Sequence, residues 1–384
     1  MRNNFAPLQD LLNAAEDEFG VKYSKDWKRL LKAPQNLEGE YSIREGAKVI
    51  EKEAFSECNS LKSVIIPNSV TIIEDWAFLG CCSLRSIDIP DSVTKIGVSA
   101  FSGCSSLMSI HMPDSVTSIG YNAFEGCISL KNIHIPDSVT SIGSNAFEEC
   151  VSLKSIIIPD SVTRIEGWTF YYCKSLKSII IPDSVTSIGD SAFAQCNSLT
   201  SINIPNGVTS IGDSAFSNCH SLTSVTIPSS VIAIGTNPFC GCPADLKNES
   251  KAFIYEHNVL FNKDKTTLIS YRAKEANYVI PDSVTSIGEC AFLECNSLPS
   301  IIIPDSVTSI GVCAFAQCNS LTSINIPDSV TTIANHAFYN CKSLKSIKIP
   351  DSVTSIGDCA FEECDSLSPQ VKSDIIQRFG ENVF

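Results

Sequence analysis

Prolines recur every 23 residues along most of this chain, and this fixed period constrains the fold more than any other feature. The series runs through Pro67, Pro90, Pro113, Pro136, Pro159, Pro182, Pro205 and Pro228, and it resumes at Pro281, Pro304, Pro327 and Pro350. The repeated unit reads L-x-S-I-x-I-P-D-S-V-T-S-I-G-x-x-A-F-x-x-C-x-S. A period in the twenties is typical of a solenoid, in which each unit buries its apolar face only against its neighbours. We therefore predict a stack of coils for the 384 residues, not two or three globular domains.

The copy that begins at Leu199 shows how one unit is expected to fold. Ile202 and Ile204 alternate with polar residues, which predicts a short strand whose two isoleucines point inward. Pro205 ends this strand because it has no N–H to give to a ladder. A second extended segment and one helical turn complete the unit, and their inward-facing residues are Val208, Ile211, Ala215, Phe216 and Cys219. The fold class is therefore a repeat solenoid, mainly β with short helical turns, in which a right-handed coil recurs about thirteen times.

A glycine follows the second extended segment in many units. The column includes Gly97, Gly120, Gly143 and Gly189. A positive φ would explain glycine at this point. Other units carry Glu51, Glu74, Glu166 and Ala334 in the same column. We interpret the glycine as a preferred turn residue and not as an obligatory one.

The period also divides the chain. It assigns residues 41–242 and 277–367 to the repeat. The end of a solenoid exposes an apolar cross-section, so we expect helical caps at residues 1–40 and 368–384. In the first cap, helical stripes run through Leu8, Leu11, Leu12 and Ala15 and through Trp27, Leu30 and Leu31. In the second cap, Ser368 and Pro369 are typical of a helix start and Gly380 of a helix end.

Residues 243–276 form an insertion, because the period breaks by 30 extra residues between Cys242 and Pro281. Residues 259–261 and 267–271 are apolar runs on either side of a polar loop at 262–265, and this pattern predicts a β-hairpin. The hairpin is interpreted either as an extra packed element or as a projection that contacts a partner.

The pattern LxxIxIPxxVxxIGxxAFxxC over residues 41–367 resembles the BspA-like (Treponema pallidum-type) leucine-rich repeats of bacterial and protist proteins. The resemblance implies a curved leucine-rich-repeat solenoid that functions in adhesion and in binding host or matrix proteins. It brings no catalytic residues to this chain.

Charge and hydropathy limit the partners. The net charge of −14 argues against nucleic acid and against an anionic membrane, since both attract a cationic face. No run reaches the roughly 18 apolar residues that span a bilayer, so we expect no membrane insertion. Acidic residues interrupt the first twenty positions, which is not typical of a signal peptide. We expect a cytoplasmic protein, with the cell surface or secretion by a non-classical route as the alternative.

Thirteen of the 18 cysteines share one column at the 23-residue spacing. Stacked copies would hold their Cβ atoms side by side, which is the wrong disposition for a disulfide, so we expect a row of small buried thiols. Free thiols in this number also favour a reducing compartment. A second column holds Cys290, Cys313, His336 and Cys359. Its four members span three coil spacings, too far for one tetrahedral zinc, so we expect neither a metal nor a cofactor.

A candidate partner-binding surface lies on the outward face of the first strand. Residues that depart from the repeat place apolar and basic side chains together there, namely Lys131, His134, Lys154, Ile157, Lys177 and Ile180. Exposed apolar residues bordered by charge are typical of interaction surfaces. We predict a contact patch whose lysines attract a protein with an acidic surface. The alternative is that isoleucine merely suits a strand and lysine keeps its surface soluble.

The sequence favours a non-catalytic protein-interaction or adhesion module over two other classes. A polysaccharide-active solenoid enzyme would need unique carboxylates in adjacent coils, and Asp88 and Glu166 are the candidates outside the repeated aspartates. A purely structural spacer would need no special surface. A second group of departures, Glu166, Trp168, Tyr171 and Tyr172, is interpreted as packing or as a platform for a sugar. The oligomeric state cannot be inferred.

Overall fold

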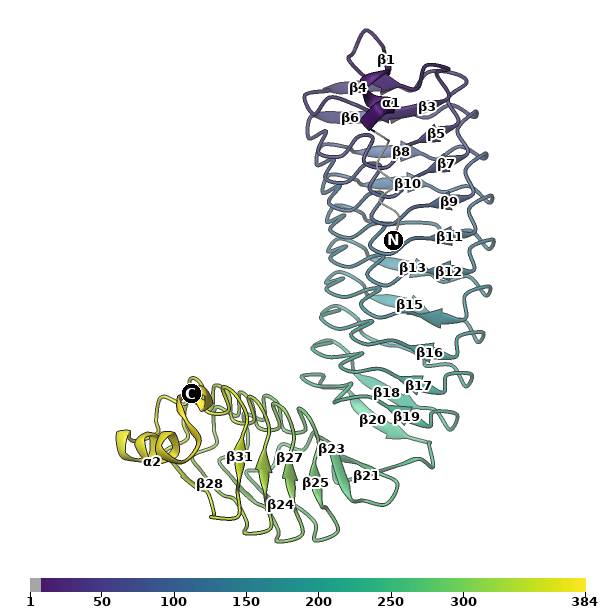
Figure 1. Ribbon diagram of the computed structural model, residues 1–384. Coiled ribbons are helices and arrows are strands. Elements are labelled where there is room, and N and C mark those ends of the chain that lie inside the picture. Colours follow the sequence, from purple (N-terminus) through teal and green to yellow (C-terminus); the bar gives the residue numbers. More distant parts are fainter. Residues whose placement is uncertain (1–7) are drawn as a thin grey trace. The chain divides into compact units, whose positions relative to one another are not determined.

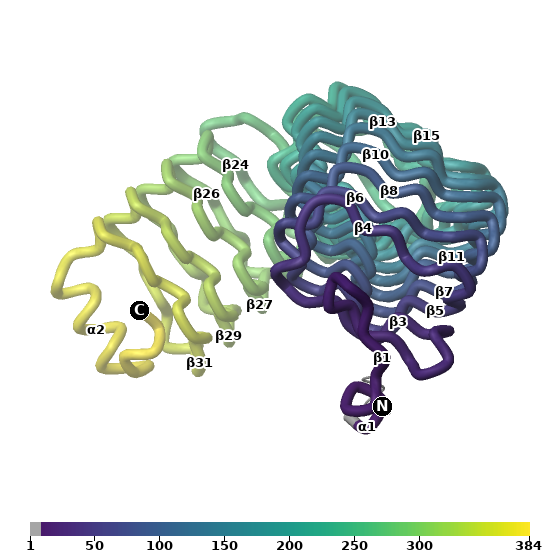
Figure 2. Tube along the Cα trace, turned by 90° about the horizontal axis from the view of Figure 1, so that it is seen from above, coloured from purple at the N-terminus to yellow at the C-terminus, as the bar shows by residue number. Residues whose placement is uncertain are grey.

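The computed structural model describes residues 8–384, which divide into two compact units (Figure 1). The first unit comprises the chain up to Val225 together with Cys242–Asp245, and the second comprises Thr226–Gly241 and Leu246–Phe384. Each unit is a stack of coils, and Figure 2 shows those of the first unit lying one behind another. The predicted solenoid is confirmed.

Each coil of the first unit adds short strands to parallel ladders. One ladder contains β4 (Gly39–Ser42), β6 (Leu61–Ile65), β8 (Ser86–Asp88) and β10 (Ser109–His111), and β13 (Ser155–Ile157) pairs with β15 (Ser178–Ile180) further along the stack. A second ladder contains β5 (Val49–Ile50), β7 (Ile72–Ile73), β9 (Lys95–Ile96), β11 (Ser118–Ile119) and β12 (Ser141–Ile142), followed by a separate ladder of β14 (Arg164–Ile165), β16 (Ser187–Ile188) and β17 (Ser210–Ile211). Residues 23 apart are paired, as in Ile87 with Ile110 and Ile96 with Ile119. The period therefore sets the register.

The core of the first unit consists of rows of identical side chains. The phenyl rings of successive coils, from Phe55 to Phe216, stack with their centroids between 4.9 and 5.6 Å apart. The neighbouring cysteine row is buried, and each thiol from Cys81 to Cys219 donates to the phenylalanine carbonyl of the coil before it, whereas the Cys58 thiol donates to the Pro34 carbonyl. For example, the Cys150 Sγ lies 3.2 Å from the Phe124 oxygen. All these cysteines are free, as expected.

The segment expected to be a helical turn is instead a series of β-turns. In one coil, Ala146 donates its amide to Gly143 and Glu148 donates to Asn145, both within the coil. The amides of Asn145 and Phe147 donate to the next coil, to the carbonyls of residues 167 and 169. Backbone amides that alternate between local and neighbouring partners cannot form a helix. Asn145 and Glu149 adopt positive φ values of 61° and 56° to allow this alternation.

The glycine column is explained by close contact between coils and not by a positive φ. A Cβ atom on Gly120 would lie 2.6 Å from the carbonyl carbon of Gly97 in the preceding coil. Glycine therefore lets the backbones approach. The ladder is interrupted between β12 and β14, where Glu166 occupies the column, but it stays continuous from β5 to β9 past Glu51 and Glu74, so glycine is not required for the pairing.

The first end of the stack differs from the expected helical cap. Helix α1 (Leu8–Leu12) covers only part of the first predicted stripe, and β1 (Ala15–Glu16), β2 (Lys22–Tyr23) and β3 (Arg29–Lys32) follow. The helix predicted through Trp27, Leu30 and Leu31 is wrong, because Leu30 and Leu31 lie in β3. Strand β3 pairs parallel with β5 and antiparallel with β2, so the open edge of the ladder overrides a helical spacing.

Buried hydroxyl groups join this end segment to the first coil. The Tyr23 and Tyr41 hydroxyl oxygens lie 2.6 Å apart, and the Tyr41 hydroxyl donates to Asp17 at 2.7 Å. Burial, followed by these hydrogen bonds, raises the pKa of the Tyr41 hydroxyl well above its ordinary value. The antiparallel hairpins and this network together close the end of the stack.

The division between the units falls within β18 (Ser224–Ile227) and β20 (Asp245–Asn248), and β19 (Ala233–Ile234) belongs to the second unit. The predicted hairpin is confirmed as the antiparallel pair of β22 (Val259–Asn262) and β23 (Thr267–Tyr271). A strand that the sequence did not indicate, β21 (Phe253–Glu256), pairs with β22. The Tyr271 ring stacks 4.9 Å from Phe292, in line with the phenylalanine row, so the insertion packs into the core.

The second unit continues the coil pattern from this hairpin. One ladder contains β23, β25 (Ser286–Ile287), β27 (Ser309–Ile310), β29 (Thr332–Ile333) and β31 (Ser355–Ile356), while β24 (Asn277–Val279) pairs with β26 (Ser300–Ile302) and β28 (Ser323–Asn325) with β30 (Ser346–Lys348). Helix α2 (Pro369–Phe379) and the 3-10 helix η1 (Glu381–Val383) end the chain. The Ser368 side chain caps α2 and Gly380 ends it, which confirms the predicted C-terminal helix.

Candidate functional site

Two exposed isoleucines form the apolar centre of the candidate surface in the first unit. Ile157 in β13 and Ile180 in β15 are direct partners in a parallel pair, so their side chains lie next to each other on the outward face. They are 67% and 65% exposed. The residues on either side of each isoleucine point inward and are buried. This alternation of inward and outward side chains therefore exposes the two isoleucines to solvent.

Three lysines form a row beside this centre. Lys131, Lys154 and Lys177 are exposed and occupy successive coils. The Lys154 amide donates to the Lys131 carbonyl at 3.2 Å, and the Lys177 amide donates to Lys154 at 3.0 Å. Neighbouring parallel strands lie about 4.8 Å apart, so the three ammonium groups project from a short positive strip.

His134 is exposed but is less firmly placed than the isoleucines. Its coil has no strand on this face, and a single bridge joins Asn132 to Ser155 in the next coil. The ladder is thus interrupted between β10 and β13. The structure brings the two isoleucines together and stacks the three lysines, and it leaves His134 at the edge of this group.

An acidic row borders the same face on its other side. Asp137, Asp160 and Asp183 follow the proline that ends each strand, and all three are exposed. The sequence shows these aspartates only as members of the repeated unit, so their place beside the isoleucines was missed. The surface therefore has an apolar centre with a basic edge and an acidic edge.

A second group of side chains, of which Trp168 is exposed and the others are partly buried, lies on the turn side of the same stack. The Trp168 and Tyr171 rings are 4.7 Å apart, and the Lys174 ammonium lies 3.9 Å from the Tyr172 ring centre. Trp168 and Glu166 line an open groove of about 480 Å³. Trp168 packs on Tyr171, and Tyr172 packs on Lys174.

The two carboxylates considered for polysaccharide cleavage are not neighbours. Asp88 lies in β8, whereas Glu166 follows β14 in a different ladder. The strand position of Asp88 is occupied by Ile157 three coils later, which corresponds to roughly 14 Å along the stack at about 4.8 Å per coil. Glycosidase carboxylates are about 5–9.5 Å apart, so these two do not form such a pair.

In-register coils, a buried leucine, isoleucine and phenylalanine interior and an exposed strand face define a leucine-rich repeat solenoid. The family model described as BspA type Leucine rich repeat region matches residues 35–150, 117–245 and 270–384. The chain belongs to this family.

Solved structures agree with this assignment. A leucine-rich repeat protein from Bacteroides ovatus is 30% identical with a TM-score of 0.57, and the match covers 96% of each chain. A leucine rich cell surface protein from Faecalibacterium prausnitzii is 28% identical with a TM-score of 0.56, and the match covers 92% of this chain and 93% of that one. No curated protein matches the chain.

Proposed function

We propose that the chain is a non-enzymatic protein-interaction module that binds its partner on the outward strand face of the first unit. The observation that carries this proposal is the pair of exposed isoleucines on β13 and β15, Ile157 and Ile180, held between a basic and an acidic row. Leucine-rich repeat proteins typically serve in protein–protein interaction, which supports the same conclusion.

The physical contributions of the patch differ in kind. Full burial of one isoleucine side chain contributes about 1.5–3 kcal/mol, so Ile157 and Ile180 would supply most of the affinity. Exposed lysines add less to affinity and more to the rate of encounter, because their field attracts an acidic surface over several ångströms. The aspartate row restricts the orientation of the partner, since it repels acidic groups at the other edge.

The location of the protein is part of this proposal. Most thiols of the row are buried, and this shields them from oxidants, so the row is compatible with an oxidising compartment as well as with a reducing one. The relative from Faecalibacterium prausnitzii is described as a cell surface protein, which favours display of the strand face outside the cell. Within residues 8–384, no helix is both long enough and apolar enough to cross a membrane. Surface labelling of intact cells distinguishes a displayed protein from a cytoplasmic one.

The test replaces both isoleucines of the patch. A partner is first identified by cross-linking in native cells and then titrated with the purified chain. The double variant Ile157→Asp and Ile180→Asp should raise the Kd at least about tenfold, because it places two charges in the apolar centre. Ile302→Asp is the matched control, since Ile302 holds the same strand position in the second unit and is 61% exposed.

The lysine row has its own readout. Lys154→Glu with Lys177→Glu should lower the association rate and reduce its dependence on salt, with a smaller effect on dissociation.

Unchanged binding by the isoleucine double variant, or an equal loss in the Ile302→Asp control, would show that the partner binds elsewhere. A chain with no saturable protein partner would be a structural spacer.

A further inference from the structure

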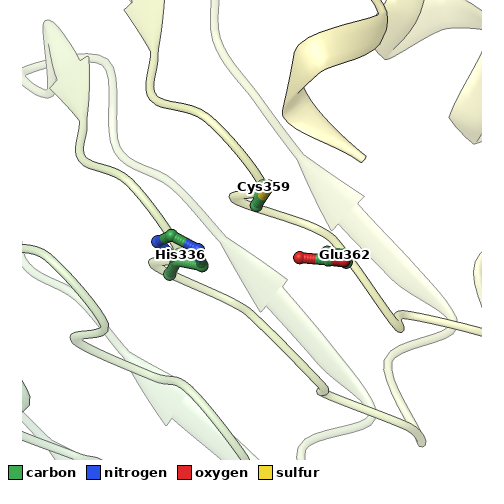
Figure 3. A group of neighbouring side chains, drawn as sticks. All are labelled: His336, Cys359 and Glu362. Carbon is green, nitrogen blue, oxygen red and sulfur yellow. The ribbon is translucent and has the colours of Figure 1, made fainter.

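Three potential metal ligands meet on the last two coils of the second unit. His336 lies on one coil, and Cys359 and Glu362 lie on the next, with their side chains directed into the same space (Figure 3). One ligand atom from each residue lies within 4.8 Å of the other two. The His336 and Cys359 side chains are half-buried and Glu362 is exposed, so the group is accessible to ions from solvent.

The repeat does not account for this group. The position of His336 and Cys359, two residues before the phenylalanine, holds Glu53, Trp76, Ser99, Asn122, Asn145, Trp168, Ser191, Ser214 and Asn237 in the other coils up to residue 237. The position of Glu362 also varies: it holds Glu125 and Glu148 in two other coils, and Ser56, Leu79, Ser102, Ala194 and Ser217 are among its remaining occupants. An imidazole, a thiol and a carboxylate therefore come together at one place because of departures from the repeat.

We propose that His336, Cys359 and Glu362 bind a divalent transition-metal ion, and that zinc is the ion this ligand set fits best. Zinc takes nitrogen, sulfur and oxygen ligands in tetrahedral geometry, with Zn–S about 2.3 Å and Zn–N about 2.0 Å. Ligand atoms in such a shell lie roughly 3.3–3.8 Å apart. Side-chain rotations that move the ligand atoms by about 1 Å would therefore bring them to these distances around the ion. The Cys359 thiol loses its proton to solvent as the Zn–S bond forms, and water takes the fourth position.

The surroundings also favour a cation. Asp358 and Glu363 are exposed carboxylates next in sequence to Cys359 and Glu362, so negative charge gathers around the proposed ligands. A bound cation would neutralise part of this charge.

The backbone holds the ligands in place from both sides. The His336 amide donates to the Asp358 carbonyl at 3.0 Å, which links the two coils directly beside the site. The Cys359 amide donates to the Asn382 carbonyl at 2.7 Å, in the segment that covers the last coil. A metal here would cross-link the terminal pair of coils, where a stack has neighbours on only one side.

From the sequence we expected no zinc site, because only the residues of one column were compared with the geometry of zinc. Cys290, Cys313, His336 and Cys359 span three coil spacings, and that objection holds for the four together. Glu362, from a different column, has a ligand atom within 4.8 Å of those of His336 and Cys359, and it would supply the third ligand within two coils. The proposed site therefore uses only two residues of that column, His336 and Cys359.

Cobalt binding to the full-length chain tests the proposal directly. Titration with Co²⁺ should give a saturable thiolate-to-cobalt charge-transfer band at one equivalent per chain, and Zn²⁺ should displace it. Cys359→Ser should abolish the band, while His336→Asn and Glu362→Ser should each raise the apparent Kd at least about tenfold. Serine or asparagine already occupies these positions in other coils, so the fold accommodates all three changes.

Two other thiols serve as matched controls. Cys313→Ser removes the neighbouring thiol of the same column and Cys82→Ser removes an exposed thiol of the first unit, and neither should change the band. X-ray absorption of the zinc-loaded wild-type protein should show one sulfur ligand among nitrogen and oxygen ligands. This measurement needs no substitution, so it does not depend on how well a variant folds. The absence of a saturable band, its persistence in Cys359→Ser, its loss in Cys313→Ser, or two or more sulfur ligands would each overturn the proposal.

Discussion

At the residue scale, cysteine has a more specific role in this chain than a small buried side chain. Most thiols in the row, such as that of Cys150, donate to the carbonyl of a phenylalanine in the preceding coil. The same carbonyl also accepts a backbone amide from its own coil, so Phe124 accepts both the Cys127 amide and the Cys150 thiol. The 23-residue spacing predicted that these residues are buried, whereas the identity of the acceptor depends on the coil geometry.

Alkaline pH should destabilise the protein through these thiols. Burial raises the pKa of the Cys58 thiol to about 12, and burial also raises the pKa values of Cys196 and Cys219. The unfolded chain ionises its thiols near pH 9, so it binds fewer protons than the folded chain above that pH. The contribution of Cys58 is fully present below about pH 9 and is lost as the pH rises towards about 12, at up to about 1.4 kcal/mol per pH unit for each thiol. Urea unfolding measured at pH 8, 9 and 10 checks this expectation.

A single variant distinguishes the thiols from other alkaline effects. Cys58→Ala should reduce the decrease in unfolding free energy between pH 9 and 10, and Cys82→Ala should not, because Cys82 is exposed. An identical pH dependence in the wild type and in Cys58→Ala would contradict this explanation.

At the scale of elements, local signals predicted some segments and tertiary pairing decided the others. Ser368, Pro369 and Gly380 specify the ends of α2 within the segment itself, and the prediction was confirmed. Leu30 and Leu31 carry no sign of the neighbouring strand β5, which converts their segment into a strand. The turn segments likewise show helical spacing, but their amides bond to the next coil.

Removal of residues 369–384 should loosen the last coil. Ile375 and Val383 are buried, and the Phe361 amide donates to the Val383 carbonyl at 2.8 Å. Without these contacts the Phe361 ring is exposed on one side, so amide hydrogens of residues 346–364 should exchange faster. Hydrogen exchange followed by mass spectrometry measures this effect. Coils of the first unit are the internal control, and unchanged protection of residues 346–364 would show that the segment is not a cap.

At the scale of the whole molecule, stability depends on contacts between adjacent coils. Each phenylalanine of the stacked row contacts one ring before it and one after it. The sequence predicted this stacking and the exposure of the isoleucine patch because both follow from the period. It did not predict the aspartate edge or the His336, Cys359 and Glu362 group, since these depend on which residues of different columns face one another.

Phe147→Ala tests the dependence on neighbouring coils. The ring lies between Phe124 and Phe170 and is fully buried, so its loss should cost about 3–5 kcal/mol and leave a cavity that touches two neighbours. Hydrogen exchange should accelerate on both sides of the substituted coil, with the largest effect nearest to it. Tyr121→Ala, at an exposed aromatic residue of the same unit, should change the unfolding free energy by less than about 0.5 kcal/mol. Acceleration confined to one side would contradict the nearest-neighbour picture.

The equivalence of successive coils has a consequence for how such a chain changes over generations. Because the surface that one coil presents to the next is nearly the same at every step, deletion of a whole 23-residue copy would join two faces that already fit each other. Unequal recombination between near-identical copies can therefore lengthen or shorten the recognition face without a new core, while the terminal hairpins and α2 are retained. Copy number becomes a heritable variable that is separate from the chemistry of any single coil.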